Sequence, residues 1–164
     1  MDEDRRMVGR ARSAAAILGM AFLLAGCGDH KAGVEDLRKL VRPSSPNSYL
    51  ICAKNLCAAA VDEDGPVFDL PPEKLLVAAV KVASLQSNTS PADADPALGQ
   101  LVFIQRTAVL QFPDIVRVQA IAVPGGKSAL ALYSRSVYGH YDFGANRRRA
   151  RAWVEAIKAE LGRP

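Results

Sequence analysis

Three apolar segments between residues 101 and 137 follow one another with only short turns between them. They cover 101–110, 115–123 and 129–137 and are rich in valine, isoleucine and leucine, as strands are. Residues 112–114 divide the first two segments, and residues 124–127 divide the last two. Links of this length join neighbouring antiparallel strands. The sequence therefore predicts an antiparallel meander of three strands or more.

The second of these segments alternates in polarity. Val116 and Val118 fall on one side of the strand, and Arg117 and Gln119 fall on the other. Because successive side chains of a strand point to opposite faces, this pattern predicts a sheet with one buried face and one face in water.

Two segments have the periodicity of amphipathic helices. The first covers 71–86 and opens with two prolines, which the first helical turn tolerates. The second covers 145–161, and its apolar stripe includes Ala150, Trp153 and Ile157. Two helices that pack against a meander make an α+β domain.

The remaining segments are less regular. Apolar residues recur at helical spacing over 34–41, which predicts a short helix there. Residues 87–99 are rich in Ser, Asn, Asp, Ala and Pro, so this stretch is expected to be a flexible loop.

The N-terminus has the organisation of an export signal. Arginines precede an apolar run over 14–24, which is too short to cross a bilayer core of ~30 Å as a helix. The run ends in Leu24-Ala25-Gly26-Cys27, which resembles the lipobox of bacterial lipoproteins. The resemblance implies a diacylglyceryl (palmitate-type) lipid on Cys27. The alternatives are an ordinary signal peptide or a buried N-terminal helix, and translation starts at Met1 or Met7.

These observations divide the chain into a signal peptide (1–26), a tether with a short helix (27–42) and a single α+β domain (43–164). Acyl chains on Cys27 would hold the domain at a membrane without a spanning helix. An Asp directly after the lipidated Cys retains such proteins at the inner membrane of enteric bacteria, and Gly28 stands at that place here. The expected location is therefore the bacterial cell envelope, with the outer membrane facing the periplasm favoured over the inner membrane.

Two further cysteines, Cys52 and Cys57, would meet an oxidising compartment after export. They are expected either to form an intrachain disulfide or to remain two buried thiols, depending on whether their Cα atoms lie within about 7 Å.

The stretch 134–149 has the spacing of a family signature. It reads S-R-S-V-Y-G-H-Y-D-F-G-A-N-R-R-R, which resembles the C-terminal pattern S-R-S-R-x-G-x-x-D-x-G-x-N-x-x-R of the domain of unknown function 1499. Val137 stands in place of the second arginine. Upstream, 45–47 reads S-P-N like the opening of that family, with Ser48 in place of its usual cysteine. The likeness covers about 43–157 and implies a small α+β domain, often secreted or membrane-linked, with no implied activity.

Two interpretations of this signature follow from the start of the second helix. In the first, Asp142 holds either the helix amides or Arg149, Asn146 ties the corner to the sheet, and Arg135 forms an ion pair on the strand. In the second, first-turn amides and arginines bind an anion. Spacing favours the capped corner, because charge runs near helix ends are usually solvated.

Charge and motifs leave few possible classes of function. A net charge of +4 is a mild excess that does not by itself indicate a nucleic-acid partner. Two His and three Cys leave little material for a metal site, and no motif indicates a cofactor. We expect a non-catalytic binding or structural module in the envelope, whose partners are the membrane, through Cys27, and an anionic ligand or an envelope protein. The alternative is a small enzyme with a site around His140, Asp142 and Arg135.

Overall fold

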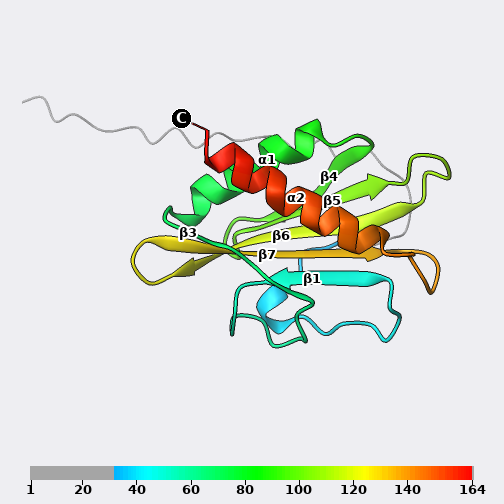
Figure 1. Cartoon of the computed structure of the whole chain (residues 1–164), viewed down its shortest axis with the longest axis horizontal. Coiled ribbons are helices and arrows are strands. Elements are labelled where there is room, and N and C mark those ends of the chain that lie inside the picture. The colour runs from blue at the N-terminus through cyan, green and yellow to red at the C-terminus, as the bar shows by residue number, and fades with distance from the viewer. Residues whose placement is uncertain (1–31, 164) are drawn as a thin grey trace, which may run out of the picture.

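The computed structural model describes residues 32–163. Its strands form one open, seven-stranded sheet (Figure 1). The order across the sheet is β2-β1-β7-β6-β5-β4, with β3 also paired to β7. All pairs are antiparallel except β1 with β2. The strands are β1 (Ser48–Cys52), β2 (Glu63–Asp64), β3 (Val67–Phe68), β4 (Thr89–Asp95), β5 (Gln100–Arg106), β6 (Pro113–Val123) and β7 (Lys127–Ser136).

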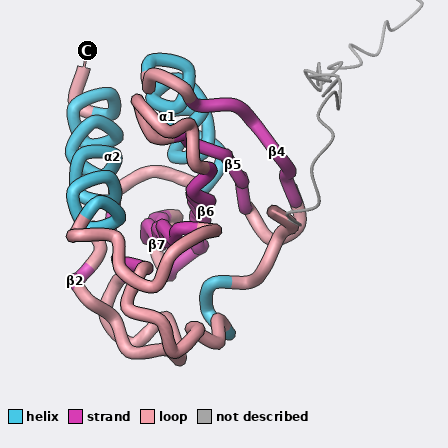
Figure 2. The backbone as a smooth tube through the Cα atoms, turned by 90° about the vertical axis from the view of Figure 1, so that its right-hand side faces the viewer, coloured by secondary structure: helices cyan, strands magenta, loops and turns pink. Residues whose placement is uncertain are grey.

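Three helical elements complete the fold. They are the 3₁₀ turn η1 (Leu37–Lys39) and the helices α1 (Pro72–Leu85) and α2 (Ala145–Leu161). Viewed along the sheet, α1 and α2 lie on one face and η1 lies on the other (Figure 2). The architecture is α+β, as the sequence predicts, and the segment predicted to be a signal peptide (1–26) lies outside the described residues.

The predicted meander is present, and its turns explain its register. Gly125 and Gly126 connect β6 to β7 with φ values of 84° and 70°, which residues with a Cβ atom rarely adopt. The resulting hairpin pairs Val123 with Lys127 and continues along the strands to Asp114 with Ser136.

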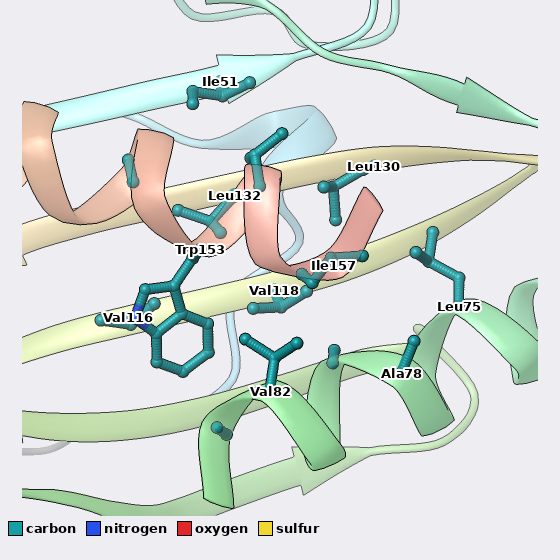
Figure 3. Close-up of a cluster of buried hydrophobic side chains, with 14 of the residues drawn as sticks. Ile51, Leu75, Ala78, Val82, Val116, Val118, Leu130, Leu132, Trp153 and Ile157 are labelled. Atoms are coloured by element: carbon teal, nitrogen blue, oxygen red, sulfur yellow. The ribbon is translucent and has the colours of Figure 1, made fainter. Parts of the chain in front are cut away.

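The main core lies between the sheet and the two helices (Figure 3). Trp153 is fully buried there, and its ring centroid lies 5.3 Å from that of Phe103 on β5. Val118, Leu132 and Ile157 pack into the same cluster. The apolar stripe predicted for 145–161 therefore faces the sheet, and each large side chain contributes about 1.5–3 kcal/mol by leaving water.

The opposite face of the sheet is also buried, which corrects the prediction of a face in water. Arg117 and Gln119 on this face are only 4% and 1% exposed. The reason is that the chain from residue 32 onward covers them: Leu37 packs there, and its amide donates to Gln119 Oε1 at 2.8 Å. Periodicity within one strand does not reveal a cover supplied by a distant segment.

Two predicted segments differ in the structure. The expected flexible loop over 87–99 contains the edge strand β4, whose register shifts between Pro91 and Asp93. Edge strands carry polar residues and proline because one side has no partner, so its composition looks like that of a loop. The helix expected over 34–41 is only the three-residue turn η1.

Of the two alternatives for Cys52 and Cys57, the structure contains the disulfide. Cys52, the last residue of β1, is bonded to Cys57, with their Cα atoms 6.3 Å apart. The bond closes the short loop that leaves β1 on the face covered by η1.

Candidate functional site

One carboxylate holds together the corner at which α2 begins. Asp142 Oδ1 accepts a hydrogen bond from the Gly144 amide at 3.0 Å, and Asp142 Oδ2 accepts one from the Asn146 amide at 2.7 Å. Gly144 precedes the helix with a φ of 74°, which suits glycine. Asp142 therefore satisfies N–H groups that have no acceptor inside the helix.

The side chain of Asn146 is fully buried and connects α2 to three other segments. Its Nδ2 donates to Asn47 O at 2.8 Å, to Ser136 Oγ at 2.9 Å and to Asp142 Oδ2 at 2.8 Å. Its Oδ1 accepts from Ser134 Oγ at 2.7 Å. Both N–H groups and the carbonyl of this amide are engaged, so its burial carries no unpaired polar group.

Arg149 extends the network one helical turn further. Its Nη1 donates to Asn146 Oδ1 at 2.8 Å and to Ser134 Oγ at 3.1 Å. Its Nη2 forms an ion pair with Asp114 of β6, and the two side chains are 11% and 4% exposed. A buried charge needs such a partner because desolvation without one is costly.

Asn47, just before β1, joins the same network from the other end of the chain. Its carbonyl accepts from the Ser136 amide at 3.0 Å, and its Nδ2 donates to Gly139 O. Ser45 Oγ donates to Asn47 Oδ1 at 2.8 Å. We call this assembly the signature corner; its members are Asn47, Asp114, Ser134, Asp142, Asn146 and Arg149.

The hydrogen bonds of the signature corner support the capping interpretation. Burial by itself raises the pKa of Asp142, but hydrogen bonds from the Asn146 and Gly144 amides outweigh it and hold this pKa below its usual range. Asp142 is therefore a charged capping group. The amides that an anion would need already donate to this carboxylate.

Two of the other predicted site residues lie away from this corner. Arg135 pairs in register with Ser48 and Ile115, and its side chain points to the face opposite that of Ser134. His140 is exposed, and its ring contacts that of Tyr141 edge-on with centroids 4.7 Å apart. Cys27 lies outside the described residues.

A pocket of about 330 Å³ opens beside Arg135, on the face of the sheet that faces away from α1 and α2. The chain between residues 35 and 43 forms one wall, and β7 forms the other. The lining residues are Glu35, Leu40, Val41, Arg42, Pro43, Tyr133 and Arg135.

Positive charge near this pocket exceeds negative charge. Arg42 is paired with Asp62 at 2.8 Å. The Arg135 guanidinium has no hydrogen bond or ion pair within residues 32–163. Arg117 lies nearby on the same face: burial, together with the charge of Arg135, lowers its pKa, while Glu35 opposes that shift.

Two buried polar atoms on this face have no partner in the described part of the chain. They are Arg117 Nη1 and the hydroxyl oxygen of Tyr133. The rest of the Arg117 guanidinium is only partly satisfied, because Nε donates to Gly33 O at 3.1 Å and Nη2 lies 3.7 Å from Glu35 Oε2. Unpaired buried polar groups are uncommon, and a bound water or ion is one of the explanations for them.

Sequence reasoning missed several of these residues. Asp114 stands in a turn motif, and no spacing links it to Arg149. The alternation of Arg117 with valines predicts a solvated face for it. Tyr133 and Arg42 carry no motif, and only the position of the chain around residues 35–43 brings them to Arg135.

Within residues 32–163, His, Cys, Asp and Glu side chains do not gather in groups of three or more that could hold a metal ion. In the same part of the chain, no helix is long and apolar enough to cross a membrane.

Comparisons with known proteins give a family but no activity. A family model described as "Protein of unknown function (DUF1499)" matches residues 42–157. No curated protein matches the chain. Among solved structures, one titled "Crystal structure of Ara h 8.0201" is similar, with a TM-score of 0.46 and 11% sequence identity, over 71% of this chain and 98% of that one.

The first prediction concerns the buried amide of the signature corner. Asn146→Ala is expected to lower the free energy of unfolding by about 1–3 kcal/mol, because it leaves buried polar partners unpaired. The matched control is Arg147→Ala on the exposed side of the same turn, which should change stability by no more than about 0.5 kcal/mol. Denaturant unfolding measures both, and equal stability of the two variants would contradict the structural role.

The second prediction concerns acid stability. Because the folded state lowers the pKa of Asp142, its contribution to stability is present above the ordinary carboxyl pKa of about 3.9 and is lost as pH falls through the lowered value. The stability difference between the parent and Asp142→Asn should therefore be large near neutral pH and shrink below about pH 4.

The control for the acid prediction is Asp64→Asn, which removes an exposed carboxylate. Its unfolding curve should follow that of the parent across the same pH range. A constant difference between the parent and Asp142→Asn at every pH would show that the lowered pKa does not stabilise the fold.

Proposed function

The chain belongs to the DUF1499 family of proteins of unknown function, and we propose that it is a lipid-anchored bacterial envelope protein whose domain binds a small anionic ligand without catalysis. The anchor is supported by Leu24-Ala25-Gly26-Cys27 after a short apolar run. Gly28 after the anchor favours the outer membrane, with the domain facing the periplasm.

The observation that carries the binding role is the state of Arg135. Asn47, Ser134, Asp142, Asn146 and Arg149 of the signature are tied together by hydrogen bonds. Arg135 instead lines a pocket and has no partner within residues 32–163. A guanidinium without a polar partner among these residues can pair with an anionic ligand.

The chemistry of the pocket defines the class of ligand. Arg135 supplies charge-assisted hydrogen bonds, and a guanidinium matches carboxylate and phosphate groups in geometry. Leu40, Val41 and Pro43 supply an apolar wall. The pocket therefore fits a carboxylate or phosphate group attached to a small apolar body, and its volume lies near the lower end for small-molecule sites.

The alternative enzyme site at His140, Asp142 and Arg135 has less support. Both oxygens of Asp142 already accept backbone amides, so this carboxylate is not free to act as a base. Arg135 points to the other face of β7. His140 lies on an exposed loop beside Tyr141.

The third prediction tests the pocket with octyl phosphate and octanoate as probes. Both should raise the melting temperature of the parent protein, whereas octanol should not, because the apolar chain alone leaves Arg135 unpaired. Arg135→Gln should remove the shift without lowering the melting temperature of the free protein. Calorimetry with each probe gives the affinities.

The matched control for the pocket is Arg147→Gln, which removes an exposed arginine outside the pocket. This variant should respond to the probes like the parent. An unchanged response of Arg135→Gln, or an equal response to octanol, would overturn the anionic pocket.

The fourth prediction tests the anchor. Cys27→Ser should prevent lipid attachment, so the processed, membrane-bound form should disappear from a cell fractionation. Metabolic labelling with a palmitate analogue should mark the parent and not the variant. Equal labelling of both would refute lipidation at Cys27.

A further inference from the structure

Large apolar side chains are exposed at one end of the sheet. They lie in the loop between β5 and β6 (107–112) and in the loop between β7 and α2 (137–144), which project from the same end in Figure 1. We call these two loops the tip. Its exposed apolar residues are Val109, Leu110, Phe112, Tyr138, Tyr141 and Phe143.

The two loops form a continuous surface. The register places Arg106 opposite Pro113 and Asp114 opposite Ser136, so both loops leave the sheet at the same level. The rings of Phe112 and Tyr138 lie 6.0 Å apart across the loops. Adjacent exposed apolar groups of this kind mark a surface that meets a partner or a membrane.

Phe143 is the least expected residue of the tip. It is 90% exposed and has a φ of 51°, a left-handed conformation that disfavours bulky side chains. Neither burial in the fold nor backbone geometry explains a phenylalanine at this position. Strain of this kind is often found at functional surfaces.

The path of the chain places the tip near the anchor. Ala32 is buried in a cluster with Val102 and Ile115, and Val137 packs against that cluster. Val137 is the first residue of the second loop and Ile115 is the third residue of β6, so the described chain begins near the tip. Five residues lead from Cys27 to Ala32, which reach at most about 18 Å when fully extended.

The maximum length of this five-residue segment limits which end of the domain can approach the membrane. β6 runs for 11 residues from Pro113 at the tip to Val123, a length of about 33 Å at ~3.3 Å per residue. A lipid on Cys27 thus keeps the tip within reach of the bilayer and leaves the opposite end of the sheet out of reach.

The charges of the tip fit an anionic lipid surface. Arg106, Arg147 and Arg148 are exposed around the loops. The nearby carboxylates are already used: Asp142 caps α2, Asp114 pairs with Arg149, and Glu63, whose charge also acts on Arg147, pairs with Arg151. The positive charge is therefore not neutralised locally, and it attracts anionic headgroups close to the surface.

We propose that the tip is a membrane-docking surface: Val109, Leu110, Tyr141 and Phe143 enter the interface of an anionic phospholipid bilayer, and the arginines contact its headgroups. This arrangement has the physical features of interfacial anchors, which combine apolar side chains with basic neighbours. The inference rests on the proposed lipid anchor at Cys27. Docking adds a second contact with the membrane and fixes the orientation of the domain.

The test uses the lipidated protein in vesicles of phosphatidylethanolamine and phosphatidylglycerol. Val109→Cys carries an environment-sensitive fluorophore at the tip, and Val77→Cys on α1 carries it at an exposed control position. Iodide in the buffer and a spin-labelled lipid in the bilayer serve as quenchers. The label at position 109 should be quenched several-fold less by iodide and several-fold more by the lipid than the label at position 77.

Two variants identify the cause of the shielding. Leu110→Ser combined with Phe143→Ser should restore iodide access at position 109, and both residues are exposed, so folding should be unaffected. Arg147→Gln combined with Arg148→Gln should weaken shielding in these vesicles but not in vesicles of phosphatidylcholine alone.

The test separates a failure of the lipid anchor from a failure of the docking surface. If the protein does not float with vesicles, the lipid anchor at Cys27 is wrong. If it floats but iodide reaches positions 109 and 77 equally, the docking surface is wrong. Shielding of position 109 from both quenchers would show that the tip contacts a second copy of the chain, which also overturns membrane docking.

Discussion

The ion pair between Arg149 and Asp114 is a buried contact between α2 and the sheet. Both side chains are almost completely removed from water, so each charge requires the other and requires hydrogen bonds for its remaining polar atoms. Ser134 and Asn146 supply these bonds to Arg149. The position of α2, and with it the placement of Trp153 in the core, depends on this arrangement.

The two sides of β7 have different roles in this account. Ser134 and Ser136 face α2; Ser134 belongs to the signature corner, and Ser136 accepts a hydrogen bond from Asn146 of that corner. Arg135 lies between them and points to the opposite face, where it borders the pocket with Tyr133. Strand alternation thus explains how one short signature contributes both to stability and to a candidate binding site.

Local patterns were sufficient for much of the fold. The turns between apolar segments predicted the meander, and the spacing of Ala150, Trp153 and Ile157 predicted the helix face that packs on it. The capping role of Asp142 was also predicted, because it depends on residues within four positions. These features rest on interactions that are close in sequence.

Long-range contacts were beyond these patterns. Gln119 and Arg117 are buried by a segment more than 80 positions away, and Asp114 meets Arg149 across 35 positions. The composition of β4 predicts a loop, because an edge strand tolerates proline and polar residues. The pocket depends on how residues 35–43 cross the sheet, which periodicity does not describe.

A double-mutant cycle on Asp114 and Arg149 tests the central claim most directly. Denaturant unfolding of Asp114→Asn, Arg149→Gln and the double variant gives their coupling energy. If the buried pair fixes α2 on the sheet, each single change destabilises strongly, and the coupling exceeds about 1 kcal/mol because the second change removes a charge already left unpaired. Effects that add to within about 0.3–0.5 kcal/mol would show that the two residues act independently and would contradict the account.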